Sequence, residues 1–526
     1  MTNLVRLEKE TMQLPLARVS IFVASSLVAL TAALAETPDI PASGTATPIE
    51  HLVVIFQENV SFDHYFATYP NASNAAGEPV FVPHAFARRT PGVNGLSGPL
   101  LDHNPNAVQP FRLSRAQAIV CDQGHDYTGE QKAVDNGLMD KFVELDGTTQ
   151  TSCNNPAMGK GLVMGYYDGN TVTALWNYAQ HFALSDNFFS TTFGPSTLGH
   201  LNLISGQTSG ATVAHDSGNA AAALVNTTVI NDIRPAFDDC VPSTANTISM
   251  SGMNVGDLLN QKGVTWGWFQ GGFAPTTRNP DGSAACALQH TQFDGTPSVA
   301  DYIPNHNPFQ FYQSTSNPHH LPASSLDMIG QSDAANHQYD LADFFTALRA
   351  GNLPSVSFLK APAFEDGHAM YSNPLDEQRF LVSTINALED SPFWGATAVI
   401  IAYDDSDGWY DHVMPPIVNG SGSTADALGG FGICGKRAPG APDGRCGYGQ
   451  RLPLLVISRH AKANYVDHSI TDQTSILRFI EDNWSLGRIG GSSFDAMAGS
   501  LLNLFEFEDG GDARKLYLDP ASGQPR

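Results

Sequence analysis

Two hydrophobic runs that lie far apart in the chain are each followed by a pair of polar side chains. The runs are residues 49–56 (IEHLVVIF) and 397–403 (TAVIIAY), and both are mostly apolar and rich in β-branched residues. This pattern predicts parallel strands that are covered on both faces. The polar pairs are Glu58-Asn59 and Asp404-Asp405, and each comes shortly after its predicted strand has ended.

The hydrophobic pattern elsewhere predicts a layered α/β fold. Further strand-like runs lie at residues 264–269, 355–359 and 452–457, and helical periodicity appears at residues 375–388 and 473–482. Strands that alternate with helices favour a layered fold with a largely parallel sheet. Gly-, Ser-, Ala- and Asn-rich segments predict loops or insertions over one rim of that sheet, at residues 206–250, 270–300 and 418–448.

The two polar pairs predict a metal site. In open parallel sheets, ligands bind beyond the carboxyl ends of the strands. Neighbouring residues within a strand point to opposite faces, so two of them converge on one ion only where the strand has ended. The alternative interpretation is that each pair lies in a solvated loop or caps the helix that follows. The presence of two similar pairs favours the metal site.

The first 35 residues have the features of an export signal. Arg18 precedes an apolar stretch that closes with Ala33-Leu34-Ala35, a small-residue cleavage pattern. We therefore expect a signal peptide over residues 1–35 and a secreted or periplasmic protein, with Met12 as an alternative start. The alternative is an uncleaved membrane anchor. Residues 36–526 are expected to form a single catalytic domain, because the candidate site residues are spread from Glu58 to Asp405.

Charge and cysteine content narrow the possible functions. The 526 residues include 52 acidic and 27 basic side chains, for a formal net charge of −25. This charge disfavours nucleic-acid binding, which requires basic groups, but it allows a small phosphorylated substrate where a cation reverses the local potential. An even set of six cysteines without a CxxC pair favours disulfides, with nearest-neighbour pairing the simplest arrangement of Cys121, Cys153, Cys240, Cys286, Cys434 and Cys446.

One serine and three histidines are candidates for catalysis. Ser196 lies in a Gly-Pro-Ser-Thr segment before a possible helix, whose N-terminal N–H groups would assist an alkoxide that attacks a phosphate. A plain helix cap is the alternative for Ser196. His125, His306 and His368 lie in polar segments that contain Gly or Pro, and an imidazole there can bind a phosphoryl oxygen or protonate a leaving group. Each of them also fits a structural role, as most of the 17 histidines must.

Four long motifs resemble the bacterial phosphoesterase family that joins secreted acid phosphatases with phospholipases C. They are IEHLVVIFQENVSFDHYF, MGYYDGNTVTALWNYAQHFALSDNFFSTTFGPST, IIAYDDSDGWYDHV and TDQTSILRFIEDNW, and the resemblance spans nearly all of the chain after the leader. It implies a three-layer α/β/α sandwich with a central, mostly parallel sheet, similar to the alkaline phosphatase core. The forms GPST and DGNTVTALWNYA look like the acid phosphatase branch, whereas phospholipases C usually show GPT followed by Pro-Asn-Arg.

The resemblance also implies roles for individual residues. One divalent metal ion, whose identity the sequence leaves open, would be held by Glu58, Asn59, Asp404, Asp405 and Ser196. Ser196 would also be the nucleophile, and His125, His306 and His368 would surround the phosphate. One departure is Asn305, which stands where the acid phosphatases have a second histidine beside His306. An amide cannot transfer a proton, so His368 is the first candidate for the leaving-group acid, ahead of His306.

Three functions follow as hypotheses. The first is a secreted, metal-dependent acid phosphatase that hydrolyses phosphomonoesters through a phosphoserine. The second is a phospholipase C acting on phosphatidylcholine-type lipids, which an aromatic rim formed by residues 267–275 would favour, although Trp and Phe are more often core residues. The third is a non-catalytic exported binding protein. Loss of Ser196 or of a polar pair would indicate that third function, and both are retained.

Overall fold

The computed structural model describes residues 44–526 apart from residues 85–91, 150–155, 292–297 and 509–513. All of the described residues belong to one compact unit, Ile40–Arg526. The signal peptide predicted for residues 1–35 lies outside the described residues. Within the described part of the chain, no helix is both long and apolar enough to cross a membrane.

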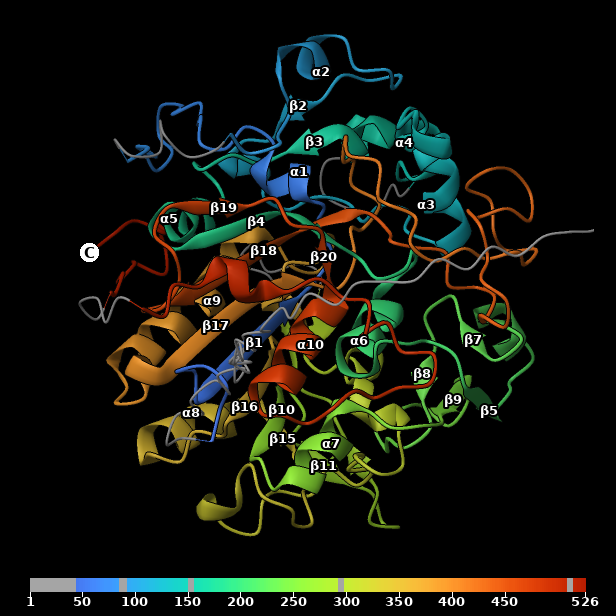
Figure 1. Cartoon of the computed structure of the whole chain (residues 1–526), viewed down its shortest axis with the longest axis vertical. Coiled ribbons are helices and arrows are strands. Elements are labelled where there is room, and N and C mark those ends of the chain that lie inside the picture. The colour runs from blue at the N-terminus through green and yellow to red at the C-terminus, as the bar shows by residue number, and fades with distance from the viewer. Residues whose placement is uncertain (1–43, 85–91, 150–155, 292–297, 509–513) are drawn as a thin grey trace, which may run out of the picture. The chain divides into compact units, whose positions relative to one another are not determined.

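A nine-stranded sheet forms the centre of this unit, in the order β15-β10-β16-β1-β17-β18-β4-β19, with β20 also paired to β4 (Figure 1). All neighbouring strands are parallel except β18, which is antiparallel to both β17 and β4. The largely parallel sheet is therefore confirmed. The strands are β1 (His51–Gln57), β4 (Ala183–Phe189), β10 (Trp266–Gln270), β15 (Gln338–Asp340), β16 (Val356–Lys360), β17 (Thr397–Tyr403), β18 (Arg451–Ser458), β19 (Tyr465–Asp467) and β20 (Thr471–Asp472).

Helices cover both faces of the sheet, as expected for a three-layer sandwich (Figure 1). Consecutive residues of β10 show the two faces, because Trp268 contacts His200 of α6 whereas Phe269 contacts Phe344 of α8. Helices α7 and α10 pack against α6, and α5 packs against α9. The helices are α5 (Thr173–His181), α6 (Ser196–Ser205), α7 (Val255–Lys262), α8 (Leu341–Ala350), α9 (Pro374–Asp390) and α10 (Gln473–Asn483).

The two predicted helices begin at side-chain caps. Asn373 accepts hydrogen bonds from the N–H groups of Leu375 and Asp376, and Pro374 occupies the first turn of α9. Asp472 caps α10 in the same way through the N–H of Thr474. These caps satisfy backbone donors that have no partner inside the helix, which explains why both helices begin close to the predicted positions.

The first two predicted insertions contain short strands of their own. Strands β5 (Ala211–His215), β8 (Arg234–Pro235) and β9 (Thr247–Met250) form a small sheet in the first insertion. The second carries two short antiparallel pairs, β11 (Thr277–Arg278) with β12 (Ala284–Ala285) and β13 (Gln289–Thr291) with β14 (Ser298–Ala300). Short, polar strands of this kind carry little of the alternating hydrophobic signal from which a strand is predicted.

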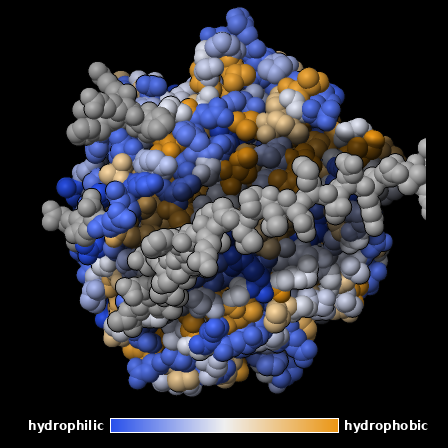
Figure 2. Space-filling model, viewed as in Figure 1, coloured by the Kyte–Doolittle hydropathy of each residue, from blue (hydrophilic) through white to orange (hydrophobic). Residues whose placement is uncertain are grey.

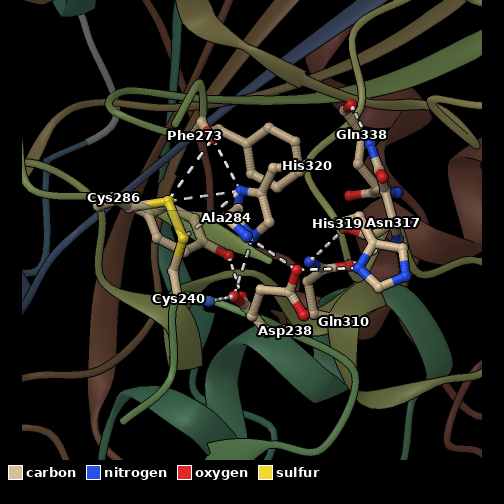
Figure 3. Close-up of polar contacts among 12 residues, drawn as sticks. Asp238, Cys240, Phe273, Ala284, Cys286, Gln310, Asn317, His319, His320 and Gln338 are labelled. Carbon is tan, nitrogen blue, oxygen red and sulfur yellow. Dashed lines mark hydrogen bonds and ion pairs between the residues drawn. A yellow bond between two sulfur atoms is a disulfide. The ribbon is translucent and has the colours of Figure 1, made fainter. Parts of the chain in front are cut away.

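Disulfides cross-link the insertions. Cys240–Cys286 joins the first two insertions, and Cys434–Cys446 closes the third, both as nearest-neighbour pairing predicts. Cys121 is also disulfide-bonded, and its nearest neighbour Cys153 lies outside the described residues. Beside the first bridge, His320 lies between Asp238 Oδ1 at 2.9 Å and the carbonyl oxygen of Phe273 at 2.7 Å (Figure 3). These contacts anchor the insertions to the body of the protein.

Candidate active site

The polar pairs lie side by side at the carboxyl ends of two neighbouring strands. Gln57 at the end of β1 is paired with Tyr403 at the end of β17, so Glu58 and Asp404 follow at the same edge of the sheet. Asn59 has a φ of 50°, a left-handed conformation that breaks the strand alternation. Its N–H donates to Asp404 Oδ1 at 3.2 Å. The two pairs therefore converge as the sequence predicts.

Ser196 is the first residue of α6 and lies between these pairs. Its Oγ is 3.2 Å from Glu58 Oε2 and 3.1 Å from Asp405 Oδ2. The helix approaches so closely that a Cβ on Gly199 would lie 2.2 Å from the carbonyl oxygen of Asp404. Only glycine allows this packing, which sets the distance between Ser196 and the strand ends.

Lys360 and His306 contact the other oxygen of Glu58. Lys360 Nζ lies 2.5 Å from Glu58 Oε1, and His306 Nδ1 lies 3.0 Å from the same atom. Burial would raise the pKa of Glu58, but the neighbouring His306 and Lys360 outweigh it and hold that pKa well below its usual value. His200 lies 3.5 Å from Asp404 Oδ2, and burial lowers its pKa to about 4. Glu58 is therefore ionised at the centre of the site.

The pKa values of Asp404 and Asp405 are raised in this crowded site. Burial, followed by the charges of Glu58 and Asp405, raises the pKa of Asp404 well above its usual value. For Asp405, burial is again the largest cause, and its pKa rises to about 6. A cation between these groups would offset both effects, because it replaces repulsion between like charges with attraction.

The oxygen atoms at this point fit a divalent cation. Among the described residues, Asn59 Oδ1 and Asp404 Oδ2 are buried and accept no hydrogen bond. Such atoms are costly unless something satisfies them. Carboxylate, amide and hydroxyl oxygens suit Mg, Mn, Ca or Fe, and Zn accepts them as well. The predicted ligand set of Glu58, Asn59, Asp404, Asp405 and Ser196 is thus chemically suitable, and it leaves the choice of metal open.

Two of the predicted histidines lie together, apart from His306. The rings of His125 and His368 are 6.2 Å apart, and His125 Nδ1 lies 3.2 Å from Asp407 Oδ1. Burial would lower the pKa of His125, but the charges of Asp405 and Asp407 raise it well above its usual value. His368 stacks on Tyr371 at 4.2 Å between ring centroids, which fixes its orientation. The site therefore has histidines from two directions.

Two residues of the site were missed in the sequence. Lys360 is the last residue of β16, the parallel neighbour of β1, so the strand prediction at residues 355–359 already placed the residue after it at the same edge. His200 lies four residues after Ser196, one helical turn away, and its Nδ1 is 2.8 Å from the Ser196 carbonyl oxygen. In both cases the sequence could have indicated the residue by its distance along the chain from a predicted strand or from Ser196.

A cavity of about 630 Å³ adjoins this group of residues. His125 and Pro195 line it on the side of the catalytic candidates, together with Asn305. Arg234, which contacts Asn305, and several carboxamides of the first insertion also line the cavity. The cavity gives a polar ligand room beside Ser196.

The structure is a layered α/β fold that holds a buried serine among carboxylates at the carboxyl ends of parallel strands. Residues 49–487 match the phosphoesterase family, and the chain belongs to this family. The resemblance found in its motifs is thereby confirmed.

Named relatives extend the comparison. The chain is 26% identical over 479 residues to a non-hemolytic phospholipase C of Pseudomonas aeruginosa. The aligned region covers 88% of this chain and 58% of the relative. Phospholipase C A of Mycobacterium tuberculosis is 25% identical over 483 residues, which covers 89% of this chain and 79% of that protein. The chain thus spans less than two thirds of the Pseudomonas relative.

The matches to solved structures are distant. A protein in the alkaline phosphatase superfamily from Vibrio parahaemolyticus is 12% identical, with a TM-score of 0.28, over 63% of this chain and 65% of that one.

Proposed function

We propose that the protein is an exported phosphoric ester hydrolase that uses Ser196 as its nucleophile, and that it cleaves phospholipids in the manner of a phospholipase C. The observation that carries the proposal is the position of Ser196 Oγ, 3.2 Å from Glu58 and 3.1 Å from Asp405 at the start of α6. A hydroxyl group between two carboxylates can lose its proton to one of them while its oxygen turns toward phosphorus.

Each residue of the site has its own role in the proposed reaction. The Ser196 oxygen forms a bond to phosphorus as the bond from phosphorus to the leaving oxygen breaks, and water later hydrolyses the phosphoserine. His368 gives a proton to the departing oxygen, and His125 and His306 face the phosphoryl oxygens. When bound by Glu58, Asn59, Asp404, Asp405 and Ser196, a divalent cation supplies positive charge that acidifies the serine hydroxyl and polarises the phosphoryl group.

The relatives support a lipid substrate over the acid phosphatase that the GPST motif favoured. Those named above are phospholipases C. The aromatic rim that residues 267–275 would form is absent, because Trp268, Phe269 and Phe273 are buried core residues. A different apolar surface exists, since Phe431 is 81% exposed and Ile433 is 51% exposed. Hydrophobic residues gather near α3 (Tyr127–Val134) and α4 (Phe142–Leu145) in Figure 2, where the third insertion also lies in Figure 1.

An acid phosphatase remains the second candidate. The cavity beside Ser196 is lined largely by polar side chains, which suits a small, water-soluble phosphomonoester.

One assay separates the two functions. Purified full-length protein is given phosphatidylcholine vesicles or nitrophenyl phosphate across pH 4 to 8, with and without a chelator. Release of phosphocholine faster than release of inorganic phosphate supports the phospholipase, and the reverse supports the phosphatase. The proposal would be contradicted if neither product formed, or if Ser196→Ala released product as fast as the wild type.

A further inference from the structure

Arg234 is a cation that lines the cavity, and none of the carboxylates that the structure describes pairs with it. It lies in β8 of the first insertion and lines the cavity of about 630 Å³ beside the site. Among the described residues, no ion pair to Arg234 is present, although the chain carries 52 acidic residues. In such an acidic protein, an arginine without a carboxylate partner is available to an anion that enters the cavity.

A buried amide holds the arginine in place. Arg234 donates from Nη1 to Asn305 Oδ1, and Asn305 Nδ2 donates to Thr197 Oγ1 at 3.4 Å. Asn305 is buried, whereas Arg234 is only partly buried. Thr197 directly follows Ser196, so this chain of contacts links the guanidinium to the residue next to the proposed nucleophile. A guanidinium has five N–H donors, so one bond to Asn305 leaves others free for phosphate oxygens.

The acidic neighbour on the same segment is already engaged. Asp232 Oδ1 accepts from Thr197 N at 3.0 Å and from Thr197 Oγ1 at 2.7 Å. It therefore caps the first turn of α6 rather than neutralising Arg234.

Besides Arg234, the titratable residues that line the cavity are His125, Asp126 and Asp232, and the rest of the lining is uncharged. The first insertion contributes the carboxamides of Asn219, Asn231 and Asn246. Asn231 Oδ1 is buried and accepts no hydrogen bond from the described residues. A carboxamide can both donate and accept hydrogen bonds, so this group of side chains suits a hydroxylated ligand.

We propose that Arg234, held by Asn305, is a substrate-binding residue that pairs with a phosphoryl oxygen, and that the carboxamides beside it receive a hydroxylated organic group attached to that phosphate. This inference rests on the proposed hydrolysis of phosphate esters, and it names the part of the substrate that the cavity takes: the polar end, away from any acyl chain.

The test measures binding separately from turnover. The dissociation constant of inorganic phosphate is measured by calorimetry on the folded full-length protein, and KM and kcat are measured with nitrophenyl phosphate. Arg234→Gln should weaken phosphate binding by about tenfold or more and raise KM in proportion, with a smaller change in kcat, since an ionic hydrogen bond to phosphate contributes about 1.5–3 kcal/mol. Arg234→Lys should give an intermediate result, because it keeps the charge but loses the planar fork.

Matched variants make the outcome specific. Arg437→Gln removes the same charge from the third insertion, where Arg437 pairs with Asp443, and it should leave phosphate binding unchanged. Asn305→Ala keeps the charge of Arg234 but frees its side chain, and it should weaken phosphate binding less than Arg234→Gln does. If the Arg234→Gln protein does not fold, Asn305→Ala becomes the decisive variant.

Several outcomes would overturn the inference. A folded Arg234→Gln protein with wild-type phosphate affinity would do so, as would an equal loss of affinity in Arg437→Gln. A wild-type protein that binds no phosphate at millimolar concentration would also overturn it. A wild-type protein that binds phosphate through Arg234 but hydrolyses no ester would support the inference while contradicting the proposed function.

Discussion

The hydroxyl group of Ser196 has one hydrogen and two carboxylate neighbours. Its Oγ lies 3.1 Å from Asp405 Oδ2 and 3.2 Å from Glu58 Oε2, so the hydrogen serves one carboxylate and the other faces a lone pair. The second carboxylate and the lone pair of the hydroxyl oxygen repel each other. This repulsion is relieved if one carboxyl group is protonated or if a cation binds between the two carboxylates. The same atoms are therefore suited to hold an ion and to release a nucleophilic oxygen.

Substitution of this serine tests the nucleophile. Ser196→Ala should lose nearly all turnover, by a factor of about 10³ or more, while the protein still binds phosphate, because the carboxylates and histidines are unchanged. Thr197→Ala should cost much less, since the Thr197 hydroxyl donates to Asp232 and not to the carboxylates of the site. Rapid quenching with labelled substrate should trap label on a peptide that contains Ser196. Label on a histidine would assign the attack to another residue.

The proposed metal ligands can be tested by measuring the content of bound metal. Glu58→Gln and Asp404→Asn should each lower metal retention and activity together, because each removes one negative oxygen from the same group. Elemental analysis after dialysis measures the metal, and circular dichroism checks the fold. A variant that keeps full metal content at the wild-type rate would remove that residue from the ligand set.

The sequence predicted the parts of this site that follow from strand ends. Glu58, Asn59, Asp404 and Asp405 could be placed because the strands before them are continuous apolar runs. The partners of these residues could not be placed in the same way. The ion pair between Lys360 and Glu58 depends on which strand lies beside β1, which only the tertiary fold determines.

At the scale of elements, one side chain of α3 joins two loops of the site. Glu130 accepts from the N–H of Gly194 at 2.7 Å and from Ser406 Oγ at 2.8 Å. Gly194 lies two residues before Ser196, and Ser406 follows Asp405. Burial is the largest cause that raises the pKa of Glu130, to about 8. The carboxyl group thus links the loop before Ser196 to the loop after Asp405 and holds them at a fixed separation.

Removing this link should lower activity without removing any group that touches the substrate. Glu130→Ala should reduce kcat by about tenfold to a hundredfold, because small displacements of reacting groups are costly. Glu130→Gln keeps one acceptor oxygen and should recover part of that loss. Glu144→Gln, an exposed change on the neighbouring α4, is the control. Equal kcat values for Glu130→Ala and wild type would show that the loops hold their positions without this residue.

Elements were predictable where burial produced a continuous apolar pattern. All five predicted strands are present, whereas β4 was missed because Ser185, Asp186 and Asn187 interrupt its apolar residues. Polar residues are tolerated there because Asp186 pairs with His468 at 2.7 Å, a contact made across 282 residues. Long-range partners of this kind leave no local trace in the sequence.

At the scale of the whole molecule, acidic residues are both abundant and deeply buried. The formal net charge is −25, and burial raises the pKa of several carboxyl groups, to about 7 for Glu377 and to about 8 for Glu130. Tyr65 and Tyr403 donate to Glu377 at 2.9 Å and 2.7 Å, which only partly offsets the effect of burial. Such groups prefer to be protonated in the folded protein.

This preference predicts that the protein is more stable in weak acid than at neutral pH. Between pH 4.5 and 7, folded Glu377 keeps a proton that the unfolded chain has lost, so the free energy of unfolding falls as pH rises through this window. One such group changes that free energy by at most about 1.4 kcal/mol per pH unit. Urea unfolding at pH 5, 6, 7 and 8 should therefore give midpoints that decrease with pH. Glu377→Gln should flatten this trend, because glutamine has no proton to lose, whereas the exposed Glu144→Gln should follow the wild type. Parallel curves for Glu377→Gln and wild type would place the origin of the trend in other carboxyl groups.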